Sequence, residues 1–117
     1  MSDQIRVIKT DADLAWGEIP QDADDPRPPA SETVEHRAAD GRFAVGFWKR
    51  GPEQGQMELT EFHEVMFIIE GEIEITAEDG TVNMVGPGDL VIAPQHSRGT
   101  WKALSPVKKV WAIYREG

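Results

Sequence analysis

The stretch from Glu58 to Gly71 reads E-L-T-E-F-H-E-V-M-F-I-I-E-G, and the stretch from Gly86 to Trp101 reads G-P-G-D-L-V-I-A-P-Q-H-S-R-G-T-W. Together they decide the fold. The first contains a continuous apolar run that predicts a strand covered on both faces, and Gly71 ends it. The second opens on Gly86-Pro87-Gly88-Asp89, a combination that reverses the chain. Both stretches therefore predict strands bounded by tight turns.

Similar strand signals surround these two stretches. Glu72 to Thr76 alternates polar and apolar residues, which predicts a strand with one wet face. Asp79-Gly80 predicts a two-residue type I′ hairpin, because both central positions of that turn need positive φ. Further strands are predicted at Arg42–Lys49, Thr81–Val85, Leu90–Ala93, Thr100–Leu104 and Val107–Tyr114. About eight short strands without a long helix indicate an all-β protein, either a closed barrel or a two-sheet roll.

The first 32 residues differ from the rest. A short strand is predicted at Ile5–Ile8, and one helical turn is predicted from Thr10 to Trp16. Residues 21–30, Q-D-A-D-D-P-R-P-P-A, are acidic and rich in proline, so an extended or mobile connection is predicted there. The sequence thus predicts one domain, with residues 1–32 as an irregular amino-terminal arm and residues 33–117 as the barrel.

Charge and composition limit the range of partners. The 117 residues carry 21 acidic and 12 basic side chains, a formal net charge of −9, which disfavours nucleic acid and anionic membranes as partners. No apolar run approaches the roughly 20 residues needed to cross a bilayer, and the amino terminus lacks the features of a secretory signal. There is no cysteine, which excludes disulfides and a cysteine nucleophile. We therefore expect a cytoplasmic protein.

The spacing of several residues resembles that of the cupin superfamily. Glu64 lies seven positions before Gly71, as at the end of the first cupin block, and Gly88 lies six positions before Pro94, as at the start of the second. The resemblance covers roughly residues 43–114. It implies the cupin-type double-stranded β-helix, a jelly-roll barrel of the RmlC-like kind. Trp48, the E-V-M-F-I-I-E-G phrase and Gly99-Thr100-Trp101 further resemble the cupins related to (S)-ureidoglycine aminohydrolase and to ethanolamine utilisation.

The metal ligands of typical cupins are mostly missing. Their first two histidine positions fall on Glu58 and Thr60 in one alignment, or on Met57 and Leu59 in the other, and the second-block histidine falls on Gly99. Glu64 alone remains in register, whereas a transition-metal site needs three or four converging donors. The resemblance therefore predicts no metal site and no cofactor, with a divalent metal as the disfavoured alternative.

The candidate site residues follow from the cupin cavity. Glu64 is the candidate general base or amine-binding carboxylate, and His96, in the loop after Pro94, is the candidate proton shuttle. Lys109 is the candidate residue to neutralise Glu64 or to bind an anionic group of the ligand. Its neighbour Lys108 should face the opposite side of the strand. Each has a structural alternative: an ion pair for Glu64, a solvent-exposed loop for His96, and core or interface packing for the tryptophans. The candidate ligand-binding residues are Glu58, Thr60, Trp48, Arg98, Trp101 and Lys109.

Three functions are consistent with these residues. The central hypothesis is a module that binds a small molecule in the barrel without the usual histidine-held metal. The alternatives are a cupin enzyme acting on a small nitrogenous or carboxylated metabolite, with Glu64 as acid and base, and a non-catalytic assembly protein. Whether the chain is an enzyme is left open, because fold alone does not decide chemistry. The resemblance also implies a homodimer, since cupins commonly pair through sheet edges or an exchanged strand.

Overall fold

The chain folds into strands joined by turns. A computed structural model describes residues 4–59 and 61–116, with residues 56–59 described by their backbone alone. The strands are β1 (Gly17–Glu18), β2 (Ala30–Arg37), β3 (Phe43–Arg50), β4 (Glu53–Leu59), β5 (His63–Glu70), β6 (Ile73–Ala77), β7 (Val82–Val85), β8 (Leu90–Ala93), β9 (Ser97–Ala103) and β10 (Val107–Tyr114). No helix occurs among the described residues, so the all-β prediction is confirmed, and a membrane-spanning helix is absent from this part of the chain.

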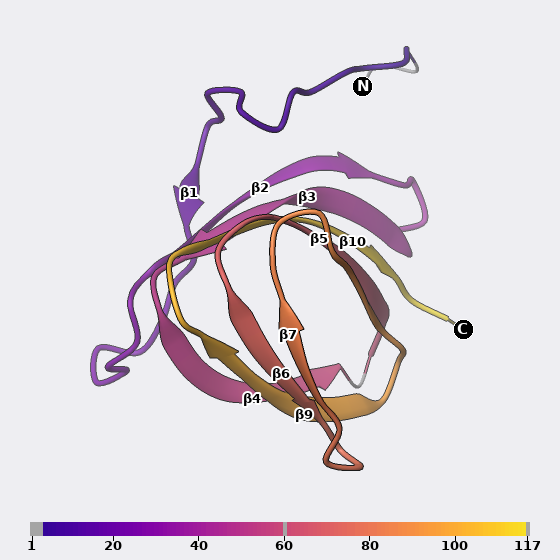
Figure 1. Cartoon of the computed structure of the whole chain (residues 1–117). Helices are drawn as coiled ribbons and strands as arrows, with labels where there is room; N and C mark the ends of the chain where they lie inside the picture. Colours follow the sequence, from indigo (N-terminus) through magenta and orange to yellow (C-terminus); the bar gives the residue numbers. More distant parts are fainter. Residues whose placement is uncertain (1–3, 60, 117) are drawn as a thin grey trace.

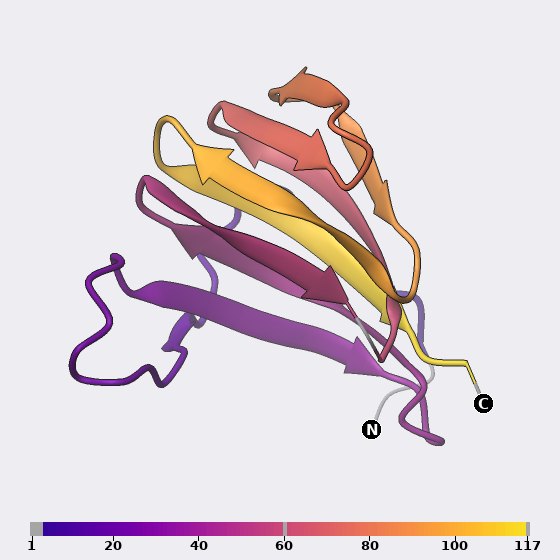
Figure 2. The same cartoon turned by 90° about the horizontal axis from the view of Figure 1, so that it is seen from below.

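Two antiparallel sheets form the walls of the barrel. One sheet has the strand order β1-β2-β3-β10-β5-β8, and the other has the order β4-β9-β6-β7. Figure 1 looks between them, with β2, β3, β5 and β10 in the upper wall and β4, β6, β9 and β7 in the lower wall. Figure 2 shows the strands running side by side across the molecule. The predicted jelly-roll barrel is confirmed.

The amino-terminal arm is less regular than predicted. Residues 5–16 form neither the expected strand nor the expected helical turn. One turn is closed by the N–H of Ala12, which donates to the Lys9 carbonyl at 3.0 Å, and a tighter one by the N–H of Trp16, which donates to the Leu14 carbonyl at 3.0 Å. The short strand β1 then pairs with β2, which already begins at Ala30. An isolated helical turn has little stability without an apolar face to bury, and this segment instead lies along the outside of the barrel (Figure 1).

The Gly86–Asp89 reversal has the predicted role. The N–H of Asp89 donates to the Gly86 carbonyl at 3.1 Å, and Gly88 has a φ of 90°. Proline at the second position and positive φ at the third define a type II turn, which requires glycine at Gly88. The Asp89 carboxylate also accepts the Gly86 N–H at 2.8 Å. The G-P-G-D phrase therefore specifies the turn between β7 and β8 by its chemistry.

The β6–β7 hairpin occurs where it was predicted, but the prediction of a type I′ turn is wrong. The N–H of Gly80 donates to the Ala77 carbonyl at 2.9 Å, and Gly80 has a φ of 90°. Asp79 does not have positive φ, because His96 is the one non-glycine residue with positive φ among those described. The turn is therefore a type I turn followed by a left-handed glycine, the other common hairpin closure. It needs positive φ at one position instead of two.

The interior of the barrel is apolar at one end and polar at the other. Along β5 the inward-facing side chains are Glu64, Met66 and Ile68, of which Met66 and Ile68 are almost completely buried. The core cluster comprises Met66, Ile68, Ile73, Val85, Ala93, Trp101, Ala103 and Val107. Glu64 continues the same strand face beyond this core. The alternation of β5 thus places one carboxylate inside the barrel, where the apolar packing ends.

Gly46 on β3 allows two neighbours to approach closely. A Cβ atom at this position would lie 2.0 Å from the Thr33 carbonyl oxygen of β2 and 2.8 Å from Cζ2 of Trp111 on β10. Both distances are too short for any side chain. The missing side chain at Gly46 therefore lets the Trp111 ring lie against the sheet and form part of the inner wall beside Glu64.

Candidate functional site

The polar end of the barrel is centred on an ion pair between neighbouring strands. Glu64 comes from β5 and Lys109 from β10, and the Lys109 Nζ lies 3.1 Å from Glu64 Oε2. The two side chains are only 13% and 11% exposed. Their backbone positions are four residues apart along the paired strands, because Glu64 pairs with Ile113 and Lys109 pairs with Ile68. The long lysine side chain therefore runs along the inner wall to reach the carboxylate.

Two indole rings and a sulfur atom surround the Lys109 ammonium. Its Nζ lies 4.7 Å from the centre of the Trp48 ring and 5.1 Å from that of Trp101. The two rings meet edge to face, with centres 6.2 Å apart. The Met66 Sδ lies 3.0 Å from the same nitrogen. Aromatic faces attract cations, and this attraction increases when water is excluded, so the rings stabilise a charge that would otherwise be costly to bury.

Burial nevertheless changes the titration of this lysine. Loss of water around the ammonium lowers the pKa of Lys109 below its ordinary value, while the charge and hydrogen bond of Glu64 act in the opposite direction. Burial disfavours the charged form of an amine and a carboxylate partner favours it. Since burial is the larger effect, more of the Lys109 amine is neutral at a given pH than for a lysine in water.

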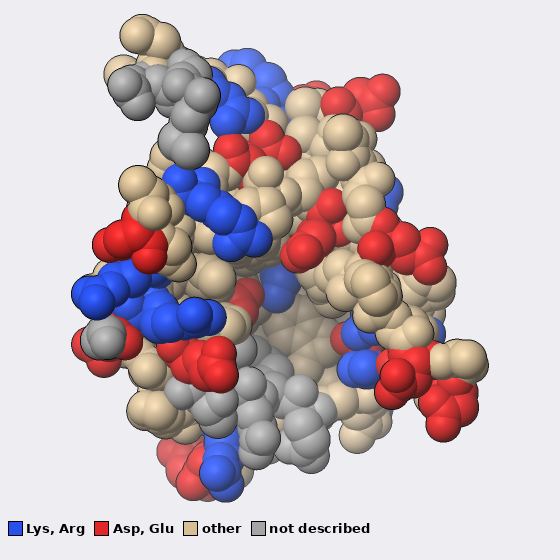
Figure 3. Space-filling view, turned by 180° about the vertical axis from the view of Figure 1, so that it is seen from behind, with Lys and Arg blue, Asp and Glu red and all other residues tan. Residues whose placement is uncertain are grey.

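A cavity of about 250 Å³ opens over this pair. Its lining residues come from the arm, from β2, β3, β5 and β10, and from the turn before β5: Ile19, Glu32, Trp48, Phe62, Glu64, Lys109, Trp111 and Ile113. The rear face of the molecule is hollowed, with basic and acidic atoms visible among neutral ones inside the hollow (Figure 3). Flat apolar walls with a few convergent polar groups are typical of small-molecule sites.

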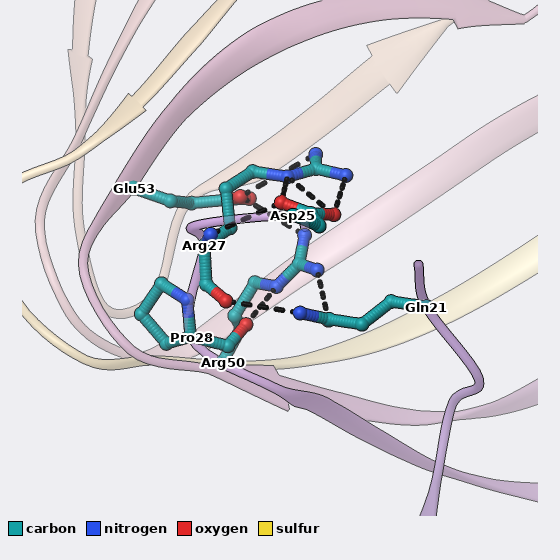
Figure 4. A network of polar contacts seen from close by, with 6 residues as sticks. All are labelled: Gln21, Asp25, Arg27, Pro28, Arg50 and Glu53. Carbon is teal, nitrogen blue, oxygen red and sulfur yellow. Dashed lines mark hydrogen bonds and ion pairs between the residues drawn. The ribbon is translucent and has the colours of Figure 1, made fainter. Parts of the chain in front are cut away.

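The arm reaches this cavity because its proline-rich loop is held to the barrel. The Arg50 Nε donates to the Pro28 carbonyl at 2.8 Å, and its Nη1 pairs with Glu53 Oε2 at 2.9 Å. The same guanidinium donates to Gln21 Oε1 at 3.2 Å. Figure 4 shows these contacts converging from the loop and from the ends of β3 and β4. The network positions the loop after Ile19, whose N–H donates to the Ala30 carbonyl at 2.8 Å.

Three candidate site residues meet at the cavity, and a fourth lies directly behind it. Trp48, Glu64 and Lys109 line the cavity, while Trp101 is 6% exposed and contacts Trp48 and Lys109. The Trp101 Nε1 is buried without a hydrogen-bond partner among the described residues. Lys108 has the opposite facing, as predicted, and its Nζ donates to the Thr10 carbonyl at 2.8 Å outside the barrel.

The remaining candidates are placed elsewhere or lie outside the description. His96 is exposed in the β8–β9 loop with a φ of 69°, and neither His96 nor Arg98 is among the described lining residues. On the backbone, Glu58 of β4 pairs with Arg98 of β9. The Glu58 side chain and all of Thr60 lie outside the described residues, so their roles stay predictions.

Sequence reasoning missed Glu32, Ile19, Phe62 and Ile113 as lining residues. Glu32 lies opposite Trp48 in the β2–β3 ladder, so both side chains face inward. That register depends on a bulge between Val34 and His36, which has no recognisable signal in the sequence. Ile19 reaches the cavity only because the arm folds back along β2. The inward position of Ile113 could have been predicted, because residues four apart in a strand share a face and Lys109 was already expected to face inward.

The described residues do not fit a cupin metal site. No three His, Asp or Glu side chains among them converge to hold an ion. Glu64, the one ligand in register, is bonded to the Lys109 ammonium, whose positive charge would repel a metal cation beside it. His63, next to Glu64, faces away from the cavity, where its Nδ1 accepts the Gln95 N–H at 3.0 Å.

The strand order and the polar cavity define the class of this protein as a cupin barrel. Residues 37–111 match the family described as the EutQ-like cupin domain, and the chain belongs to this family. Comparison with curated proteins finds no match.

Solved structures share the fold at low sequence identity. The EutQ protein of Clostridium difficile is 15% identical with a TM-score of 0.65, over 78% of this chain and 66% of that one. Ectoine synthase from P. lautus is 21% identical with a TM-score of 0.65, over 78% and 67% of the two chains. A DUF861-family protein from Pseudomonas syringae is 24% identical with a TM-score of 0.77, over 91% of this chain and 46% of that one. The likeness at this level concerns the fold alone.

The Arg27–Asp25 contact in the loop network gives a testable titration. Arg27 donates side-chain and backbone hydrogen bonds to the Asp25 carboxylate and lowers its pKa to about 2. Because the folded-state pKa is below the unfolded value of about 3.9, this contact stabilises the fold above about pH 4 and is lost as the pH falls toward 2. Arg27→Gln removes the guanidinium but keeps the backbone N–H of residue 27, so we expect the pKa of Asp25 to rise part of the way toward its ordinary value in an NMR pH series of its carboxyl carbon.

Asp79 provides the internal control for that series. Its pKa is lowered by hydrogen bonds from Thr81 on a different turn, so it should titrate identically in both proteins. An Asp25 carboxyl that titrates near 3.9 already in the parent protein would show that the Asp25–Arg27 contact of Figure 4 does not form in solution.

Proposed function

We propose that this cupin binds a small nitrogenous, positively charged molecule in the cavity over Glu64 and Lys109. The observation that carries the proposal is the charge of the described lining, where the carboxylates of Glu32 and Glu64 face the single ammonium of Lys109. Lys109 is paired with Glu64, whereas Glu32 makes no ion pair with any described residue. The excess negative charge in a partly enclosed site favours a cationic ligand.

The walls of the cavity support the same ligand class. Trp48 and Trp111 present indole rings, and Phe62 adds a third aromatic side chain. Aromatic surfaces bind substituted ammonium groups through cation–π attraction and apolar contact together. At about 30 Å³ for each water molecule, 250 Å³ corresponds to about eight waters. The site thus suits a compact metabolite rather than a polymer. The net charge of −9 likewise disfavours nucleic acid.

Choline and its neutral isostere 3,3-dimethylbutan-1-ol test this proposal as a matched pair. They have nearly the same shape and differ in the charge of one atom. We expect choline to shift the indole N–H signals of Trp48 and Trp111 in a ¹H–¹⁵N NMR titration. The isostere should bind on the order of tenfold more weakly, the equivalent of about 1.4 kcal/mol, and Glu32→Gln should reduce this difference.

Trp16 is the internal control, because its ring lies outside the barrel over Lys49 Nζ at 4.3 Å. Choline shifts confined to Trp16, or equal binding of the two compounds, would contradict a cationic ligand in the barrel.

We also propose that two copies pair through the outer face of β5 and β8. Val65 and Ile92 are cross-strand neighbours, as are Phe67 and Leu90. Their exposures of 39%, 67%, 41% and 58% leave an apolar patch at a sheet edge whose β8 backbone is unpaired on one side in the described sheet. Such patches and open edges are normally covered, and a two-fold dimer covers both at once.

Light scattering at micromolar concentration tests the dimer. The expected mass is twice the 13.0 kDa of the chain, and Ile92→Glu should give the monomer. Val82→Glu is the matched control, since Val82 is 55% exposed on β7, the edge strand of the other sheet. A monomeric mass for the parent protein would refute the proposal.

The absence of cysteine supports a cytoplasmic location for this protein. We propose that location with no nucleic-acid or membrane partner, on the basis of the strong negative charge.

A further inference from the structure

The amine of Lys109 differs from the other lysine amines of the chain. Lys9, Lys49 and Lys102 are exposed, and Lys108 directs its amine to a backbone carbonyl outside the barrel. The Lys109 amine alone among the five lines the cavity, in contact with a carboxylate, a thioether and two indole rings. Ion pairing with Glu64 accounts for one of its contacts but not for its access to an open cavity.

We propose that Lys109 is a carbonyl-reactive amine that forms an imine with an aldehyde or ketone bound in this cavity. The inference rests on the proposed function, because it concerns the same cavity, and it adds a covalent step and a substrate class. Enclosure in an apolar site is one of the ways in which proteins convert a lysine into a nucleophile at neutral pH. The lowered pKa of Lys109 agrees with this role.

Glu64 is positioned to move the protons that imine formation requires. Its Oε2 lies 3.1 Å from the Lys109 nitrogen, so it accepts the proton that the ammonium must lose. The neutral amine then attacks the carbonyl carbon, so that a C–N bond forms and the π bond of the carbonyl breaks. The proton that the attacking nitrogen loses passes to the carbonyl oxygen to give a neutral carbinolamine. Glu64 returns its proton to the departing hydroxyl, which leaves as water while the C=N bond forms. The balance is amine plus carbonyl compound giving imine plus water, with no oxidant or reductant.

The surroundings of Lys109 suit the product as well as the reactant. A protonated imine carries the same charge as the ammonium it replaces, so the ion pair with Glu64 is retained. The same charge continues to face the rings of Trp48 and Trp101. Glu32 is then available for a second positive group on the bound molecule. The class of substrate is therefore a small aldehyde or ketone that also carries a cationic nitrogen.

Reductive trapping with a matched pair of aldehydes tests the proposal. The full chain is incubated near neutral pH with betaine aldehyde or with its neutral isostere 3,3-dimethylbutanal, in the presence of cyanoborohydride. Intact mass and peptide mapping then locate the secondary amine. We expect one adduct per chain, at Lys109, formed at least tenfold faster than at any other lysine. Betaine aldehyde should react faster than the isostere.

Variants separate the roles of the two residues. Lys109→Arg should abolish the adduct at this position, whereas Lys102→Arg, an exposed control on β9, should leave it unchanged. Glu64→Gln should slow trapping at saturating aldehyde by at least tenfold. Site mapping on the parent protein needs no variant, so the test stands even if a variant folds poorly.

Two results would overturn the inference. The first is an adduct spread over the surface lysines, and the second is an unmodified Lys109 at saturating aldehyde. If choline still shifts the Trp48 and Trp111 signals of a parent protein that shows no trapping at Lys109, the proposal of binding stands and the proposal of imine formation alone is refuted. If neither choline binding nor trapping is seen, both proposals fall together.

Discussion

The organisation of this barrel depends on one largely buried charge pair. Glu64 is turned inward by strand alternation, and a carboxylate in that position needs a cation close by. At the position where the cupin pattern places a metal ligand, the Lys109 ammonium lies 3.1 Å from this carboxylate. The cation is thus part of the chain itself, held by Trp48 and Trp101. The chemistry of the cavity becomes that of an amine beside a carboxylate.

The rest of the structure presents this pair to a cavity. The apolar core fills one end of the barrel, so the charged groups lie where the packing stops and water or a ligand begins. Gly46 brings the Trp111 ring against the sheet as part of the inner wall. The Arg50 network holds the proline-rich loop to the barrel, and Ile19 thereby reaches the cavity from a segment far from the site in sequence.

Much of the fold was predictable, because turns and alternation are local properties. Gly86–Asp89 behaves as its residues require, and the opposite facing of Lys108 and Lys109 follows from strand geometry. The hairpin at Gly80 was placed correctly, but its turn type depends on φ values that the D-G pair does not determine. The arm was predicted poorly, since its conformation depends on tertiary contacts. The inward position of Glu32 depends on strand register and a bulge, which no single-sequence pattern reveals.

A double-mutant cycle on Lys109 and Glu64 tests the central claim most directly. The free energy of unfolding in urea is compared for the parent, Lys109→Met, Glu64→Gln and the double variant. Either single change leaves one largely buried charge without its partner and should cost about 2–4 kcal/mol. The double variant should lose less than the sum of the two, with a coupling of about 1–3 kcal/mol. Losses that add within about 0.5 kcal/mol would contradict an ion pair at the centre of this barrel.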